Sequence, residues 1–132
     1  MTISKIKATF SCHKEKLWNI VTSLDHYSWR SDICFIQVIH EKQFIEYTKD
    51  GVATTFYITC FDTYQRYEFD MENQNIKGHW IGIFKSKDQL TEVEFIEEVT
   101  AKKIYLKPFI KGYLKKQQKQ YIADLKRKLG EL

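Results

Sequence analysis

The sequence predicts an α+β domain in which a curved antiparallel sheet of about seven strands is covered by one long C-terminal helix. Residues 34–100 form short runs in which apolar and polar side chains alternate, as is typical of strands with one buried face. Residues 107–132 instead place apolar side chains three to four residues apart, which predicts a helix. A sheet with one apolar face needs a covering layer, and no other long helix is predicted.

Length and composition indicate a single globular domain spanning residues 1–132. Nine Phe, eight Tyr and three Trp suit an extended sheet and leave enough aromatic side chains to line a cavity. The three cysteines are odd in number and form no C-x-x-C pair, which argues against a disulfide or zinc framework. With no signal-peptide pattern and no long apolar run, we expect a cytoplasmic protein.

The net charge of +4 is unevenly distributed along the chain. Residues 101–132 hold ten of the 21 Lys and Arg residues but two of the 17 Asp and Glu residues. The C-terminal helix therefore has a basic face. Such a face is either simply solvated, or it meets anionic lipid, nucleic acid or an acidic partner protein.

The N-terminal third predicts one strand and two short helices. Residues 3–10 alternate as a strand, with Ile6, Ala8 and Phe10 on one face. Residues 12–24 place Leu17 and Val21 on one helical face, which predicts a first helix. Residues 27–32 are turn-like and predict a second helix of a single turn.

The central strands form hairpins whose turns set the strand register. We place these turns at residues 41–42, 50–51, 62–63, 73–74 and 86–89. Although chosen separately, the turns agree in giving the sheet one apolar face. That face comprises Ile36, Val38, Ile45, Tyr47, Phe56, Ile58, Cys60, Tyr67, Phe69, Met71, Ile76, Trp80, Phe84, Val93, Phe95 and Val99.

The opposite face of the predicted sheet is mostly charged. It comprises Glu46, Arg66, Glu68, Asp70, Lys77, His79, Lys85, Glu92 and Glu94. It also carries four large apolar side chains, namely Tyr57, Ile81, Ile83 and Ile96. These four indicate either an error in the register or a contact between two copies of the chain, so a homodimer is one expected partner.

Two segments have a distinctive order of packing residues. The first contains Leu17-Trp18, Leu24-Asp25, Tyr27 and Trp29, and the second comprises residues 91–95 and 98–99. The first resembles the opening helices of the START-like superfamily, in particular of its polyketide cyclase/dehydrase and lipid-transport branch, often called SRPBCC. The second resembles the last strand of that branch, although Gln89-Leu90 replaces the expected glycine step. The resemblance covers nearly the whole chain, but the matching residues are mostly packing residues. They report the fold rather than the chemistry.

The resemblance implies a helix-grip fold, in which a curved sheet wraps the C-terminal helix around a cavity that often holds an apolar ligand. Combined with the predicted register, it gives a set of ligand-binding candidates. They are Tyr47, Phe56, Tyr67, Phe69, Trp80, Phe95, Glu97 and Leu114. The family includes carriers, metabolite binders and cyclases, so the fold alone does not fix the function.

Glu97 is the sharpest catalytic candidate, because the predicted register turns it toward the apolar face opposite Gly78. A carboxyl group buried there would have a raised pKa, which suits a general acid or base. The alternative is that Glu97 lies in water at the open end of the sheet or pairs with Lys111 or Lys115.

The remaining polar residues give weaker signals. Tyr47, Tyr67 and Trp80 could orient a ligand by hydrogen bonding, or could be ordinary core aromatics. The four histidines show no metal-ligand spacing, Cys60 is expected to be a small core residue, and no nucleotide or cofactor motif is present. We therefore expect no metal and no cofactor.

Three functions fit these observations. The favoured one is a binding or carrier protein for a small hydrophobic molecule, either lipid-like or aromatic. The second is a cyclase/dehydratase-like enzyme that uses Glu97 and a cavity tyrosine. The third is an interaction module with a filled core, which meets nucleic acid, a membrane surface or a protein through Lys115, Lys116, Lys119 and Lys126.

Overall fold

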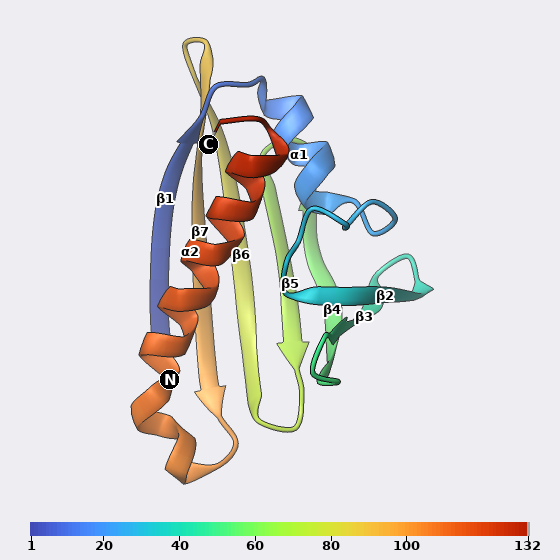
Figure 1. Cartoon of the computed structure of the whole chain (residues 1–132), viewed down its shortest axis with the longest axis vertical. Coiled ribbons are helices and arrows are strands. Elements are labelled where there is room, and N and C mark those ends of the chain that lie inside the picture. The colour runs from blue at the N-terminus through green and yellow to red at the C-terminus, as the bar shows by residue number, and fades with distance from the viewer. Residues whose placement is uncertain (132) are drawn as a thin grey trace.

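The computed structural model describes residues 1–131 and contains a seven-stranded antiparallel sheet in the order β1-β7-β6-β5-β4-β3-β2 (Figure 1). The strands are β1 (Thr2–Phe10), β2 (Ile33–His40), β3 (Gln43–Thr48), β4 (Ala53–Asp62), β5 (Arg66–Glu72), β6 (Ile76–Lys87) and β7 (Leu90–Ala101). The helical segments are α1 (Lys14–Thr22), the 3-10 helix η1 (Ile104–Phe109) and α2 (Ile110–Lys128). The predicted α+β helix-grip architecture is confirmed.

The segment after α1 differs from the prediction. Residues 27–32 form turns rather than a second helix, closed by a hydrogen bond from the Arg30 amide to the Tyr27 carbonyl (3.0 Å). One helix therefore follows β1, not two. At the other end of the chain, η1 precedes α2, so the long helix begins at Ile110 rather than at residue 107. Leu132, the predicted last residue of that helix, lies outside the described residues.

The long strands β5, β6 and β7 keep the predicted faces but not the predicted partners. Trp80 pairs with Glu97 and Gly78 pairs with Val99, a shift of two residues from the expected alignment. The shift arises because β6 and β7 are joined by a two-residue turn in which Asp88 adopts a positive φ of 58°. Since side chains alternate with a period of two, an even shift leaves each on its predicted face.

The predicted faces of β3 are wrong. A bulge near Ile39 and a three-residue loop at residues 49–51, with Gly51 at a φ of +88°, each move the pairing by one residue. Phe44 therefore pairs with Phe56 on the inner face, and Glu46 also turns inward. Tyr47 turns outward with Ile45.

The predicted inward position of Cys60 is also wrong, because a bulge interrupts the pairing of β4 and β5 between Ile58 and Cys60. Cys60 pairs with Glu68 on the outer face, and Phe61 turns inward instead. The Phe61 ring lies edge-on to Trp18 of α1, with their ring centroids 5.3 Å apart. The bulge thus converts a predicted core thiol into an aromatic contact that holds α1 against the sheet.

Helix α2 lies along β1 and β7 rather than across the centre of the sheet (Figure 1). Ser4 of β1 donates a hydrogen bond to Gln118 Oε1 (2.8 Å), and Gln118 Nε2 donates to the Ser4 carbonyl (3.0 Å). Both residues are buried, so this reciprocal pair satisfies polar groups that would otherwise be costly to desolvate. It fixes both the position and the rotation of the helix.

Three lysines of α2 cover the free edge of β1. Lys111, Lys115 and Lys126 donate hydrogen bonds to the carbonyls of Ile3, Lys5 and Thr9. These carbonyls face away from β7 on an edge strand and would otherwise be unpaired. Part of the basic face of α2 therefore stabilises the fold by binding the edge of β1.

The C-terminal half of α2 is anchored by Asp124, whose carboxylate is buried. It accepts hydrogen bonds from the Ser31 amide and hydroxyl (both 2.9 Å), from Gln120 (2.9 Å) and from Arg127 (2.8 Å). These contacts tie the helix to the turn that precedes β2.

No helix within residues 1–131 is long and apolar enough to cross a membrane.

We predict that Asp124→Ala lowers the free energy of unfolding by about 2–4 kcal/mol, because it leaves the Ser31 donors without their buried acceptor. Urea denaturation followed by circular dichroism measures this loss. The control is Gln120→Ala, which removes one of the four donors from the rim of the cluster and should cost less than about 1 kcal/mol. Equal losses in the two variants would contradict the anchoring role of Asp124.

Candidate functional site: an aromatic cavity beneath the C-terminal helix

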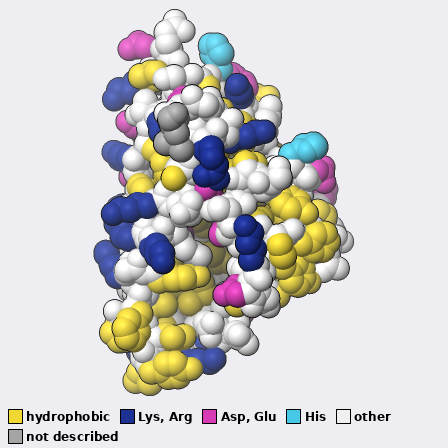
Figure 2. All heavy atoms as spheres, viewed as in Figure 1, with side chains coloured by type: hydrophobic (Ala, Val, Ile, Leu, Met, Phe, Trp, Pro, Cys, Tyr) yellow, Lys and Arg dark blue, Asp and Glu magenta, His cyan; other side chains and the backbone are white. Residues whose placement is uncertain are grey.

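A cavity of about 460 Å³ lies between the concave face of the sheet and α2. It exists because α2 lies over β1 and β7, which leaves the inner faces of β3, β4 and β5 uncovered by the helix. In Figure 2 it is visible as a recess with apolar atoms inside, beside the exposed apolar side chains of the β2–β3 region. The interior is therefore not filled by side chains, contrary to what the interaction-module hypothesis expected.

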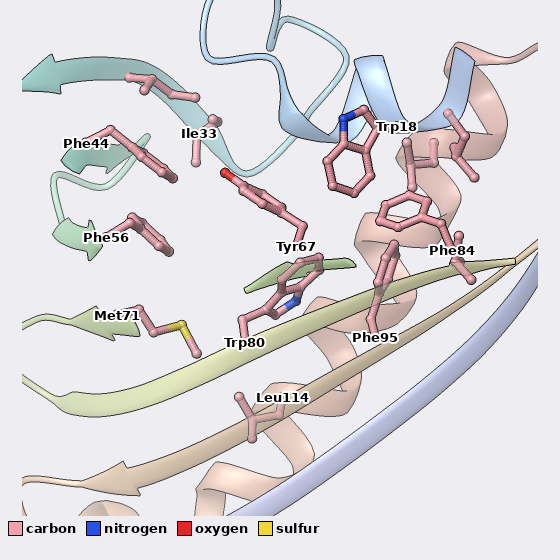
Figure 3. Close-up of a cluster of buried hydrophobic side chains, with 14 of the residues drawn as sticks. Trp18, Ile33, Phe44, Phe56, Tyr67, Met71, Trp80, Phe84, Phe95 and Leu114 are labelled. Carbon is pink, nitrogen blue, oxygen red and sulfur yellow. The ribbon is translucent and has the colours of Figure 1, made fainter. Parts of the chain in front are cut away.

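Stacked aromatic rings form a large part of the cavity wall (Figure 3). Phe44 and Phe56 stack with their ring centroids 4.9 Å apart and an interplanar angle of 6°. Phe69 and Trp80 stack with their ring centroids 4.8 Å apart and an interplanar angle of 3°. The ring centroids of Phe95 and Trp80 are 5.0 Å apart. These stacked and tilted ring contacts form flat apolar surfaces against which a planar or aliphatic ligand can pack.

Gly82 is required for the orientation of the Trp80 ring. A Cβ atom at position 82 would lie 2.6–2.7 Å from two carbons of the Trp80 indole, closer than real contacts allow. Because Gly82 has no side chain, the Trp80 indole can lie directly over position 82 of the same strand. The surroundings of Glu97 differ from the prediction, because Gly78, which was expected to lie opposite Glu97 and leave space over it, pairs with Val99 instead.

Six of the eight predicted ligand-binding residues line the cavity, namely Phe56, Tyr67, Phe69, Trp80, Phe95 and Glu97. Tyr47 does not: its ring stacks on Phe35 and its hydroxyl donates to Gln37 (2.8 Å) on the outer face. Leu114 is fully buried between helix and sheet but is not among the residues that line the cavity. Ile110, Tyr113, Gln117, Gln118 and Tyr121 form the α2 side of the wall instead.

A charged cluster closes the β2–β3 side of the cavity. Arg30 donates two hydrogen bonds to Glu46 (2.7 and 3.2 Å) and two to Asp32 (3.2 and 2.9 Å). Burial alone would lower the pKa of Arg30, but the two carboxylates hold this pKa above its ordinary value. The guanidinium also lies 5.4 Å from the centroid of the Tyr121 ring. Arg30 is thus fully paired within the protein.

Glu97 has a different environment from the other cavity carboxylates. Its side chain is 9% exposed, and no hydrogen bond or ion pair reaches its carboxyl group from the described residues. Removal from water without a compensating partner raises the pKa of Glu97 to about 7. Lys111 and Lys115, its expected alternative partners, donate instead to carbonyls of β1. The predicted inward orientation of Glu97 is confirmed.

Two tyrosine hydroxyls accompany Glu97 in the cavity. Burial raises the pKa of Tyr67, with a further contribution from Glu46, and burial also raises the pKa of Tyr121. In Figure 3 the Tyr67 hydroxyl points into the space toward Ile33 and Phe44. At the rim, Gln117 donates a hydrogen bond to the Tyr113 hydroxyl (2.8 Å). The cavity therefore combines apolar walls with a few polar atoms that can orient a ligand.

The Arg30 cluster could not be predicted from the sequence. Glu46 faces inward only because of the bulge near Ile39 and the loop at residues 49–51, neither of which follows from the alternation of apolar residues. Tyr121 packs against the core from α2, but its position beside Arg30 depends on the path of the turn before β2. No group of three or more His, Cys, Asp or Glu residues in the described part of the chain is arranged to hold a metal ion.

The fold matches solved structures at low sequence identity. A START superfamily protein from Mycobacterium smegmatis has a TM-score of 0.88 at 10% identity, covering 98% of this chain and 97% of that chain. A conserved protein from Geobacillus kaustophilus has a TM-score of 0.84 at 9% identity, covering 98% and 96%. The chain therefore has the START-like (SRPBCC) fold.

A third similar structure is the di-domain ARO/CYC protein BexL from the BE-7585A biosynthetic pathway. It has a TM-score of 0.81 at 11% identity, and the match covers 96% of this chain but 46% of BexL. This chain thus corresponds in extent to about half of that protein.

No protein-family model and no curated protein matches the sequence. At these identities, the likeness establishes the fold and leaves the ligand open.

The raised pKa of Glu97 predicts a specific dependence of stability on pH. The folded state holds a proton on Glu97 up to about pH 7, whereas the unfolded chain releases it near pH 4.5. Since the folded state binds more protons in this interval, wild-type stability should fall relative to Glu97→Gln as the pH rises from 4.5 to 7. The expected relative loss is about 3 kcal/mol, measured by urea denaturation at several pH values.

Glu98→Gln is the matched control, because Glu98 is the next residue on β7 and faces the opposite side of the sheet. Its stability should follow that of the wild type across the same interval. A constant difference between wild type and Glu97→Gln at all pH values would contradict the burial of an unpaired Glu97 carboxyl.

Proposed function

We propose that this protein binds a small hydrophobic molecule, aromatic or lipid-like, in the cavity beneath α2. The observation that carries this proposal is an unfilled space of about 460 Å³ walled by stacked aromatic rings. Its volume falls within the range of about 300–1,000 Å³ that is typical of small-molecule sites. Apolar burial against these walls would supply most of the binding free energy.

The polar groups around the cavity support an orienting role. The Tyr67 and Tyr121 hydroxyls and the Glu97 carboxyl reach the cavity without hydrogen bonds from the described residues. A few such groups in an apolar site fix the position of a ligand more than they increase its affinity. The similarity to a START superfamily protein is consistent with this role.

A cyclase/dehydratase-like enzyme is the second candidate, and a specific observation favours it. Glu97 is enclosed, unpaired and has a pKa of about 7, close to the value at which a carboxyl group exchanges protons efficiently in neutral solution. Tyr113 lies near enough that the charge of Glu97 contributes to raising the Tyr113 pKa, after the larger effect of burial. Likeness to the ARO/CYC protein BexL supports this candidate only through the fold.

An interaction module acting through the basic helix face has less support. It required a filled core, which the cavity contradicts. Of its four lysines, Lys115 and Lys126 are already engaged with carbonyls of β1. Lys116 and Lys119 remain exposed and are typical of a solvated helix face.

Native mass spectrometry tests the binding proposal and separates it from the enzymatic one. A co-purifying apolar molecule, lost on organic extraction, is the expected result. If that molecule is returned to the apo protein and recovered with its mass unchanged, the protein acts as a binder. Recovery with a loss of water or a cyclised product would establish the enzymatic candidate instead.

We also predict that Ile36→Trp abolishes or strongly weakens the binding of phenylbutanol, a neutral ligand with an apolar body. Ile36 is buried and lines the cavity, so the larger indole occupies the space that the ligand would take. Isothermal titration calorimetry measures the affinity. We expect a loss of at least about tenfold, which corresponds to a change of about 1.4 kcal/mol.

The matched control is Ile39→Trp on the same strand, because Ile39 is exposed and does not line the cavity. Its affinity for phenylbutanol should stay within about twofold of the wild type. Binding that is equally unaffected in both variants would place the ligand elsewhere and contradict the proposed site.

A further inference from the structure

The cavity is acidic although the protein as a whole is basic. Four carboxylates line it, from Asp32, Glu46, Asp50 and Glu97, and Arg30 is the single Lys or Arg residue among its described lining residues. None of the ten Lys and Arg residues in residues 101–132 lines it. The helix that covers the cavity therefore turns its basic face away from the ligand.

Arg30 cannot serve as a binding partner for an anionic ligand. Its guanidinium already contacts both Glu46 and Asp32, so the three groups together carry a net negative charge. An incoming carboxylate or phosphate would have to displace one of these buried partners, which is costly because the displaced charge would be left unpaired. The cavity thus offers no free cation within the described residues.

We propose that the cavity selects a ligand that carries a protonated amine on an apolar body, with the amine at Glu97 and the apolar body against Trp80 and Phe69. This inference rests on the proposed function, because it names the chemical class of ligand for the same cavity. It excludes fatty acids and other anionic lipids as preferred ligands.

The surroundings of Glu97 favour this arrangement. Trp80 is the direct cross-strand partner of Glu97, and its ring stacks on Phe69. The apolar body of a ligand whose amine binds Glu97 would therefore contact these two rings. Gln118 and Ser4 face the same region but are hydrogen bonded to each other, which leaves the Glu97 carboxyl available. An ammonium group between Glu97 and the aromatic wall gains both an ion pair and a cation–π contact.

This assignment also predicts how affinity changes with pH. The other titratable groups that line the cavity with Glu97 come from several elements: Tyr113 and Tyr121 of α2, Tyr67 of β5, Glu46 of β3, and Tyr27, Arg30, Asp32 and Asp50 from the turns. Arg30 remains charged near pH 7, and Tyr67, Tyr113 and Tyr121 remain neutral, since their pKa values are raised. Glu97, with its pKa of about 7, is therefore the group expected to change charge in this interval. Amine affinity should rise from pH 5.5 to pH 8 as Glu97 ionises, by about tenfold per unit well below that pKa.

The test compares phenylbutylamine, phenylbutanol and phenylbutyrate, which differ mainly in the charge of the head group. Fluorescence of Trp29 and Trp80, both of which line the cavity, reports binding in the intact protein. At pH 8 the amine should bind about 10–100-fold more tightly than the alcohol, and the carboxylate should bind most weakly. Glu97→Gln should reduce the amine's affinity to that of the alcohol and remove its dependence on pH. Glu98→Gln, on the outer face, should change neither.

The outcomes separate this inference from the function on which it rests. If the alcohol binds as tightly as the amine, or the carboxylate binds most tightly, amine selectivity is overturned while the cavity remains a binding site. If Glu97→Gln weakens alcohol and amine by the same factor, the assignment of Glu97 as the partner of the amine is overturned. If none of the three ligands saturates the fluorescence change, the proposed function fails, and the amine selectivity fails with it.

Discussion

The off-centre attachment of α2 is the constraint on which the rest of the structure depends. The buried pair formed by Ser4 and Gln118 fixes the helix over the β1 edge of the sheet, and Asp124 fixes its other half to the turn before β2. A helix held in this position cannot cover β3, β4 and β5. The curved sheet therefore encloses space there, and the aromatic side chains of these strands line that space instead of packing against the helix.

The polar groups of the domain divide into two kinds. Most are satisfied inside the protein: lysines of α2 cover carbonyls of β1, and Arg30 is held by two carboxylates. The Glu97 carboxyl has no hydrogen-bond or ion-pair partner among the described residues, and it opens onto the cavity rather than being sealed in the core. A desolvated carboxyl with no protein partner is better explained by an interaction with a ligand than by a contribution to folding.

The sequence was sufficient to predict the architecture and the inner face of the long strands, because β5, β6 and β7 alternate strictly and pair with even shifts. The prediction was wrong at β3, where one bulge and one three-residue loop place Tyr47 on the outer face of the sheet and Glu46 on the inner face. Apolar alternation cannot detect such irregularities, since Tyr47 fits an inner face as well as an outer one. The burial of Glu97 was predictable from strand parity, but the absence of a partner depended on where the lysines of α2 point.

The most direct test of this account is a carbon-13 NMR titration of the Glu97 side-chain carboxyl, with the resonance assigned by its loss in Glu97→Gln. The account predicts that this carboxyl titrates near pH 7, because it is buried in the cavity without a partner. A midpoint in the ordinary range of a glutamate, about 4.3, would show that water or a cation reaches the group. That result would contradict both the desolvation of Glu97 in the cavity and its availability to a ligand.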